Sequence, residues 1–388
     1  MSAEIRPFRA EVPDAVLADL RERLAHTRLP DQLDGAGWDY GTERGYLRAL
    51  CDHWRDRFDW RAAEARLNAY PQFTTELEGE NVHFYHVRSP EPDARPLIIT
   101  HGFPGSVIEF LDIFGPLSDP AGHGGDRRDA FHVVAPSIPG YGFSGPTRQR
   151  GFSMAKAAVV NAGLMARLGY DRYFAQGGDF GSGISTLLAA AHPDRVMGLH
   201  LNLITGRPAD PADPADPHAG LDAQEIADLA WQREYQLRES GYYVIQGTKP
   251  QTLAYGLNDS PAGLAAWIVE KFRTWSDCRG DVEASFSKDQ LLENITLYWV
   301  TGTINSAMRL YYESLGPSGR AREEHGRVEV PTAHARFPAE IMPTPRAWAE
   351  QMFNIVRWTR MPAGGHFAAF EQPGLFVADL REFCRSLR

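Results

Sequence analysis

The pattern of apolar and polar positions predicts helices over most of residues 1–80. After Pro13 the apolar residues recur at the spacing of one helix face, and this pattern ends near Pro30. These apolar residues are Val16, Leu17, Leu20 and Leu24. Two further helices are expected at 46–51 and 60–67. We therefore expect the chain to begin with a helical segment.

Short apolar runs predict strands from residue 82 onward. The runs cover 82–87, 96–100, 131–136, 173–176, 196–203, 331–337 and 354–359. Helical stretches lie between most of them. Regular alternation of strand and helix favours a mostly parallel sheet with helices on both faces, so we expect an α/β fold.

A proline-rich segment interrupts this alternation. The triplet Pro-Ala-Asp occurs three times over 208–216, and it can extend neither a helix nor a central strand. Residues 220–315 then read as helical, with long amphipathic stretches at 224–240 and 262–275. An independent helical domain would fit this stretch too, but strand signals resume after 330. A helical lid inserted into the sheet domain is therefore the better interpretation.

These patterns divide the chain into three parts. The expected parts are an N-terminal helical meander at 1–80, a core at 81–207 and 326–388, and a helical lid at 208–325.

Composition narrows the class of protein. The 388 residues are 43% hydrophobic and 23% charged, which is ordinary for a soluble globular protein, and the net charge of −10 argues against a nucleic-acid partner. No run reaches the ~18 apolar residues of a membrane span, so no membrane anchor is expected. Arginine far outnumbers lysine, which suggests the GC-rich genome of a bacterium.

The termini and cysteines point to the cytoplasm. The first residues lack the apolar core of a signal peptide. Cys51, Cys278 and Cys384 are odd in number and far apart, so a disulfide framework is not expected. No cluster of residues has the spacing of metal ligands, and we expect neither a metal nor an organic cofactor.

The run Gly177–Gly181, Gly-Gly-Asp-Phe-Gly, carries the strongest chemical signal. It lies between an expected strand and an expected helix, which is the context of a nucleophile elbow, and Asp179 stands where such an elbow usually has serine. A carboxylate is a weak acyl nucleophile, but it can displace a leaving group from sp³ carbon. The elbow therefore predicts hydrolysis of an epoxide or an alkyl halide through an aspartyl ester.

A second glycine-rich turn, 101–106, directly follows the strand expected at 96–100. Its free backbone N–H groups can point into a cleft. We expect the N–H groups of Phe103 and Phe180 to form an oxyanion hole for the tetrahedral intermediate.

A histidine with two preceding glycines lies near the C-terminus. Gly364 and Gly365 let the ring of His366 project from a loop beside the elbow, where it would deprotonate the water that attacks the ester. This role requires a neutral imidazole in the resting enzyme. Glu340, just after a strand, is the expected carboxylate on the other ring nitrogen, with Asp210 in reserve.

Opening an epoxide also requires an acid, and neutral phenols suit that role. The lid contains two tyrosine doublets, at 242–243 and 311–312, and spacing alone does not choose within either. A haloalkane hydrolase would instead need N–H donors for halide, and Trp267, Trp275 and Trp299 keep that alternative open.

The motifs together resemble those of a known family. They occur in family order over nearly the whole chain, at 5–8, 37–40, 68–73, 101–106, 177–181, 248–250, 258–261, 298–303 and 364–370. In this set the chain resembles the microsomal-type epoxide hydrolases, which include soluble bacterial members and juvenile-hormone epoxide hydrolases. The resemblance implies an α/β-hydrolase fold, a mostly parallel sheet flanked by helices with an inserted helical lid and a helical N-terminal segment.

The resemblance also implies roles for residues. It implies an Asp179 nucleophile, a His366 base, a Glu340 partner, and Tyr242 and Tyr311 as the two lid acids. Family members usually carry Trp where this chain has Phe103 and Phe180, and the membrane-anchored relatives carry an N-terminal apolar helix that this sequence lacks.

The substrate is less well defined by the sequence. The lid aromatics Trp231, Tyr255 and Trp267 predict binding of a hydrophobic or aryl epoxide, in secondary-metabolite biosynthesis or in detoxification. A dehalogenase or a non-catalytic binding protein of this fold are the competing interpretations. A homodimer is expected from base rates alone.

Overall fold

The structure is a computed structural model that describes residues 4–208, 218–316, 319 and 325–388. Its centre is one sheet with the strand order β1-β2-β3-β5-β4-β6-β7-β8-β9. From β5 to β9 every neighbouring pair is parallel, whereas β1, β2, β3 and β5 pair antiparallel. The strands are β1 Arg6–Phe8, β2 Gln72–Leu77, β3 Glu80–Val87, β4 Arg95–Thr100, β5 Phe131–Pro136, β6 Tyr173–Gly177, β7 Val196–Leu201, β8 Val328–Arg336 and β9 Phe353–Arg360.

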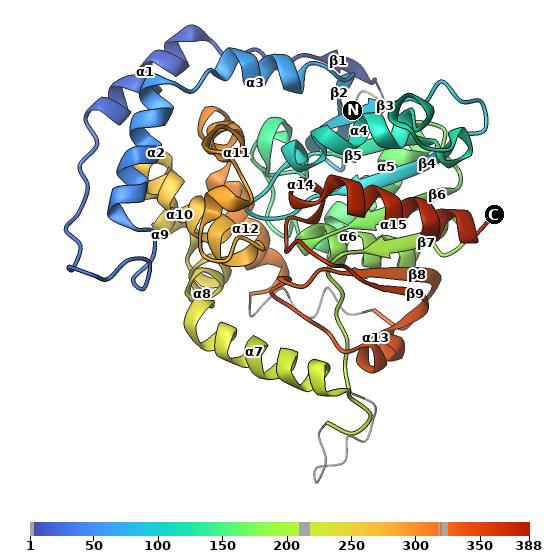
Figure 1. The fold of residues 1–388 in the computed structure, drawn as a ribbon. Helices are drawn as coiled ribbons and strands as arrows, with labels where there is room; N and C mark the ends of the chain where they lie inside the picture. The colour runs from blue at the N-terminus through green and yellow to red at the C-terminus, as the bar shows by residue number, and fades with distance from the viewer. Residues whose placement is uncertain (1–3, 209–217, 317–318, 320–324) are drawn as a thin grey trace.

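Helices cover both faces of the parallel part. The pair α4 and α15 packs together on one face, and the pair α5 and α6 packs on the other (Figure 1). Side chains of the central strand β4, such as Ile98 and Ile99, are fully buried, as the continuous apolar run predicts. The helices of this layer are α4 Leu111–Ser118, α5 Met154–Arg167, α6 Asp179–Ala191, α13 Arg346–Met352, α14 Ala368–Glu371 and α15 Pro373–Ser386.

The lid is a run of helices inserted between β7 and β8. It lies beside the carboxyl ends of the parallel strands (Figure 1). Proline at the first position of α9 and α10, and capping boxes that begin α7 and α11, mark where four of these helices start. The helices are α7 Ala223–Glu239, α8 Gly241–Thr248, α9 Pro250–Asp259, α10 Pro261–Trp275, α11 Lys288–Thr301 and α12 Ile304–Ser314.

The N-terminal segment contains helices and also two strands. The helices α1 Asp14–Ala25, α2 Arg44–Asp56 and α3 Trp60–Leu67 lie close to those predicted, and they pack on α10 and α11 of the lid. The prediction of helix up to residue 80 is wrong for β1 and β2, which belong to the sheet. The only large apolar residues of β2 are Phe73 and Leu77, so its sequence lacks the apolar run that would predict a strand. Backbone pairing with β3 stabilises it instead. Where the N-terminal domain ends stays a prediction.

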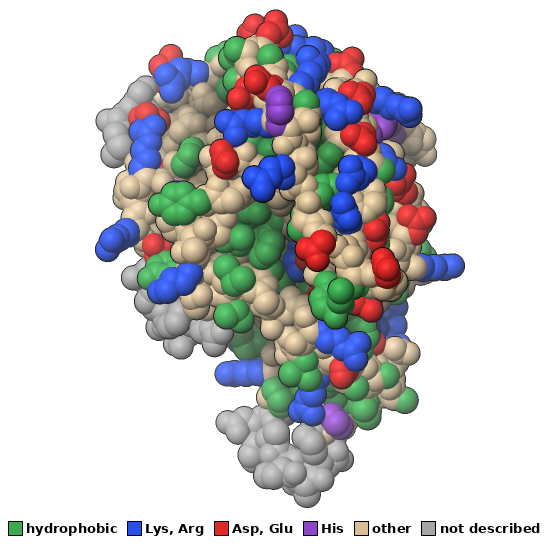
Figure 2. All heavy atoms as spheres, turned by 90° about the vertical axis from the view of Figure 1, so that its left-hand side faces the viewer, with side chains coloured by type: hydrophobic (Ala, Val, Ile, Leu, Met, Phe, Trp, Pro, Cys, Tyr) green, Lys and Arg blue, Asp and Glu red, His purple; other side chains and the backbone are tan. Residues whose placement is uncertain are grey.

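The surface carries mixed charge. On the face shown in Figure 2, acidic and basic side chains are interspersed. Within the described ranges, no helix is both long and apolar enough to cross a membrane.

Candidate active site

Asp179 occupies a sharp turn between β6 and α6. Its φ is +49°, a left-handed conformation that is rare for a residue with a side chain. The turn also brings three backbone segments into close contact, because a Cβ at Gly177 would collide with Gly181 and a Cβ at Gly181 would collide with Thr100. The glycines thus allow the strained turn that projects the Asp179 carboxylate from the carboxyl edge of the sheet.

One oxygen of this carboxylate is already bound by the backbone. Oδ1 of Asp179 accepts a hydrogen bond from the N–H of Phe103 at 2.8 Å. The N–H of Phe180 is at the second position of α6, among the donors that a helix leaves without an intrahelical acceptor. The two predicted oxyanion-hole residues therefore flank the nucleophile.

Side chains of the lid helix α11 form hydrogen bonds with the loop that carries Phe103. Asn294 of α11 donates to the carbonyl of Pro104 at 2.8 Å and accepts from the Ser106 hydroxyl at 2.8 Å. The Tyr298 hydroxyl of the same helix donates to the carbonyl of Gly105 at 2.8 Å. Helix α11 thus fixes the position of the N–H that binds Asp179.

His366 lies between two carboxylates. Its Nδ1 is 2.9 Å from Oε1 of Glu340, which follows β8 and also accepts the N–H of Ile341 at 2.7 Å. Its Nε2 is 3.3 Å from Oδ2 of Asp179, but the angles do not make a hydrogen bond there. The structure therefore brings together Asp179, His366 and Glu340, three residues predicted from separate segments.

The charge of His366 differs from the expectation of a neutral resting base. Burial lowers the pKa of the imidazole, but the adjacent Glu340 and Asp179 carboxylates outweigh it and hold the pKa well above its ordinary value. The two carboxylates therefore favour the protonated imidazole in the resting site. Once Asp179 is esterified, one of the two anions is gone, and the pKa of His366 must fall.

Two lid tyrosines face the nucleophile. Tyr242 of α8 and Tyr311 of α12 meet edge to face, with ring centroids 6.0 Å apart. Burial raises the pKa of both phenols, and the Asp179 charge adds to the rise, so both stay protonated. The neighbour Tyr312 is 40% exposed and points away from this cavity, so the structure selects Tyr311 within its doublet.

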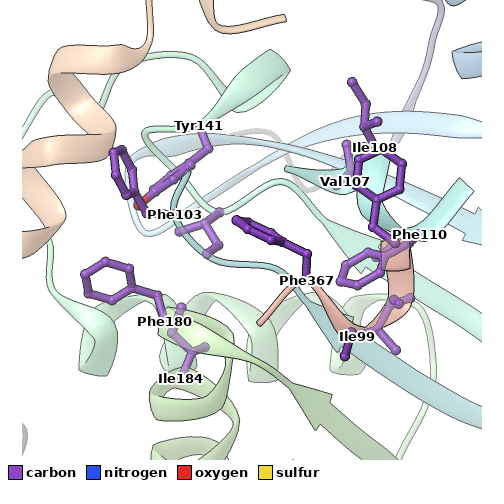
Figure 3. Packing of buried hydrophobic residues seen from close by; sticks show 14 of the residues in the cluster. Ile99, Phe103, Val107, Ile108, Phe110, Tyr141, Phe180, Ile184 and Phe367 are labelled. Carbon is purple, nitrogen blue, oxygen red and sulfur yellow. The ribbon is translucent and has the colours of Figure 1, made fainter. Parts of the chain in front are cut away.

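The rings of the oxyanion-hole residues position Tyr311. Its ring packs edge-on against Phe103 at 5.4 Å and Phe180 at 4.6 Å between centroids. Figure 3 shows Phe103, Phe180 and Phe367 reaching one buried cluster from three segments of the chain. The phenylalanines thus supply backbone donors on one side and a packing surface for a lid tyrosine on the other.

A cavity of about 340 Å³ opens in front of Asp179 and the tyrosines. Tyr243 lies on its wall as well, and most of the remaining lining is apolar: Met154, Leu187, Leu203, Leu315, Ile341 and Met342. This volume suits a small hydrophobic ligand with few polar atoms.

The three predicted substrate-binding aromatics are not among the residues that line this cavity, and their role in binding stays a prediction. Trp231 stacks on Tyr235 along α7, Tyr255 is 72% exposed on α9, and the Trp267 indole donates to Gln246. Helical spacing shows that an aromatic residue lies on some face, but only the tertiary packing decides which face meets the cavity. The reserve residue Asp210 lies outside the described residues.

Sequence reasoning missed Glu109, which lies within a small cavity beside Asp179 and His366. A signal for it existed, because Glu109 is a lone charge inside the apolar run 107–111. It also missed the hydrogen bonds that Asn294 and Tyr298 form with the 101–106 loop, because no local sequence pattern indicates them.

Fold and site together define an α/β-hydrolase, with a nucleophile elbow after a central parallel strand and a lid over the carboxyl edge. Residues 95–239 match the family model for the alpha/beta hydrolase fold, and residues 5–110 match the model for the epoxide hydrolase N terminus. The chain belongs to the epoxide hydrolase family.

Individual relatives agree over nearly the full length. Epoxide hydrolase 1 of Sus scrofa is 40% identical over 98% of this chain and 88% of that protein. The crystal structure of juvenile hormone epoxide hydrolase from the silkworm Bombyx mori superposes with a TM-score of 0.91 at 33% identity, covering 100% of this chain and 95% of that one. The epoxide hydrolase structure from Aspergillus niger gives 0.88 at 32% identity, covering 99% and 97%.

Proposed function

We propose that this epoxide hydrolase converts a hydrophobic epoxide and water to a vicinal diol through a covalent ester of Asp179. The observation that carries the proposal is the Asp179 carboxylate itself. Its Oδ1 is held by the Phe103 N–H, while its Oδ2 is free to attack and the base His366 is nearby.

In the first step, Oδ2 of Asp179 attacks one ring carbon and the carbon–oxygen bond of the epoxide breaks. The departing oxygen takes a proton from one lid phenol, and the other phenol stabilises it by a hydrogen bond. Tyr242 and Tyr311 suit this step because burial keeps both phenols neutral.

In the second step, the Asp179 anion that favoured a protonated His366 is gone, so the Nε2 proton first passes to the tyrosinate. Water then attacks the Cγ of the ester and gives one proton to the neutral Nε2 of His366. The carbonyl electron pair moves onto Oδ1, where the N–H groups of Phe103 and Phe180 bind it. When the intermediate collapses, the alkyl oxygen leaves with the proton from His366. Asp179 returns as a carboxylic acid, and its proton passes to His366, which restores the starting state. The scheme needs no metal or organic cofactor.

The substrate class follows from the cavity. Its mostly apolar wall and its volume of about 340 Å³ support a hydrophobic epoxide, aryl epoxides included. A substrate of this kind fits either secondary-metabolite biosynthesis or detoxification of foreign epoxides.

The test is a single turnover with racemic styrene oxide in heavy-oxygen water. We expect the label in Asp179 and not in the diol, because the diol oxygen comes from the carboxylate. The His366→Gln variant should accumulate an adduct of one substrate molecule, visible by intact mass, and Asp179→Asn should form neither adduct nor diol. Label in the diol after one turnover would contradict the covalent route.

A further inference from the structure

A second, much smaller cavity lies beside the nucleophile. Its volume is about 20 Å³, and it is lined by Asp179, His366, Glu109, Gln176 and Asn202 among others. A cavity needs roughly 10–15 Å³ and at least two polar partners to hold a water molecule. This cavity therefore has the size and the polarity for a single water.

Glu109 is built into the wall of this cavity. Glu109 lies in the short 3-10 turn Val107–Phe110, and its side chain is half-buried. Its carboxyl group packs directly against Gly105, so a Cβ at position 105 would collide with it. Burial raises the pKa of Glu109 to about 8. A carboxyl group kept largely neutral beside a catalytic site needs an explanation, since the scheme above gives it no role.

The cavity also contains an unpartnered donor. Nε2 of His366 has no hydrogen-bond partner, and the residue is only 5% exposed. Its charged neighbour is Oδ2 of Asp179 at 3.3 Å, and esterification removes that charge. A bound water would then satisfy this buried nitrogen.

We propose that Glu109 and His366 together hold the hydrolytic water in this cavity, and that Glu109 acts only in the second half-reaction. The inference rests on the proposed covalent mechanism. The water gives one proton to Nε2 of His366, and its other O–H donates a hydrogen bond to a carboxyl oxygen of Glu109. Its lone pair then points to Cγ of the Asp179 ester, where the new carbon–oxygen bond forms while the carbonyl electron pair moves to Oδ1.

Other groups set the charge of Glu109 during this step. His366, Asp179, Glu371 and Tyr298 lie close enough to act on it electrostatically. The negative charges of Asp179 and Glu371 favour a neutral Glu109, whereas a protonated His366 favours its carboxylate. Proton transfer from water to His366 therefore strengthens Glu109 as an acceptor at the moment when the water becomes a nucleophile.

The experiment separates the two half-reactions by rapid quench with styrene oxide. Glu109→Leu removes the acceptor at similar size, and we expect ester hydrolysis to slow by about 10–100-fold while alkylation changes by less than about threefold. The ester should then accumulate in the steady state. Glu109→Gln keeps an acceptor oxygen but cannot ionise, so it should hydrolyse the ester within about threefold of wild type while the pH dependence of that rate changes.

Glu371→Gln is the matched control. Glu371 also lies near His366, but it accepts the N–H groups of Asp277 and Phe367 and does not line the small cavity. Because Glu371 acts on Glu109 only through its charge and not by holding the water, its variant should change the ratio of the two half-reaction rates by less than about threefold. Equal slowing of both half-reactions in Glu109→Leu, or an unchanged pH profile of ester hydrolysis in Glu109→Gln, would overturn the role of Glu109. Absence of any adduct in His366→Gln would instead reject the covalent mechanism.

Discussion

Single residues around Asp179 combine backbone strain with very close contacts. The nucleophile holds a φ of +49°, and Gly102 of the oxyanion loop lies against its side chain. A Cβ at Gly102 would overlap both Cβ and Oδ1 of Asp179. The loop can deliver the Phe103 N–H to Oδ1 only because position 102 has no side chain.

Replacing Gly102 by alanine should therefore displace the nucleophile. We expect kcat/KM to fall by at least about 100-fold, because a misplacement of about 1 Å can cost that much in rate. Gly374→Ala is the control, since Gly374 begins α15 with open space around it and alanine is the better helix former. Kinetics with styrene oxide, with circular dichroism to verify folding, would measure this, and a Gly102→Ala enzyme of normal activity would refute the close contact.

At the scale of elements, two lid helices carry the proposed acids, Tyr242 and Tyr311. A third lid helix binds the 101–106 loop, which contains Phe103. Helices α8 and α12 carry Tyr242 and Tyr311 over the nucleophile, whereas α11 binds the 101–106 loop through side chains. In the proposed mechanism the lid therefore supplies part of the catalytic geometry.

Removing one phenol from the lid should slow alkylation and spare ester hydrolysis. We expect Tyr242→Phe and Tyr311→Phe each to lower the alkylation rate by about 10–100-fold, because each loses one donor to the developing alkoxide while the ring packing stays. Tyr312→Phe, the exposed neighbour on α12, should change neither rate. Pre-steady-state quench measures both steps. A loss confined to ester hydrolysis would contradict the assignment of the acids.

At the scale of the whole molecule, buried titratable groups make stability depend on pH. Burial lowers the pKa of His83 to about 3 and those of His86, His101 and His334 to about 4, and it raises the pKa of Glu109 to about 8 and of Glu371 to about 7. Below pH 6.5 these histidines become protonated in the unfolded chain but stay neutral in the folded protein. Above pH 4.5 the unfolded chain releases protons that the folded carboxyls keep.

These opposing effects predict a maximum of the free energy of unfolding near pH 6.5. Between pH 6.5 and 4.5 these four histidines outweigh the two carboxyls, so the free energy of unfolding should fall on acidification by up to about 2–3 kcal/mol per pH unit. From pH 6.5 to 8 the folded protein keeps protons on the two carboxyls and on His366 that the unfolded chain has released, so the free energy should fall again as the pH rises. Urea unfolding at half-unit pH steps would check this, and a value that rises steadily from pH 6.5 to 8 would contradict it.

A homodimer and a cytoplasmic location concern the whole molecule as well, and both stay predictions. The alternation of strands and helices and the inserted lid were predictable because amphipathic spacing and proline breaks are local properties of the chain. The bounds of α3 and β5 agree with the predicted ones for the same reason.

The sequence by itself determined the fold class, the family and the residues of the proposed site. Asp179, His366 and Glu340 lie in turns whose glycines and neighbouring strands are encoded locally, so their approach could be inferred before the sheet was seen. Tertiary structure alone decided which aromatic residues face the cavity and that β2 pairs with β3. It also decided that Glu109 and α11 contact the 101–106 loop. It also decided the charge of His366, because electrostatic fields and burial arise from segments that are distant in sequence and adjacent only after folding.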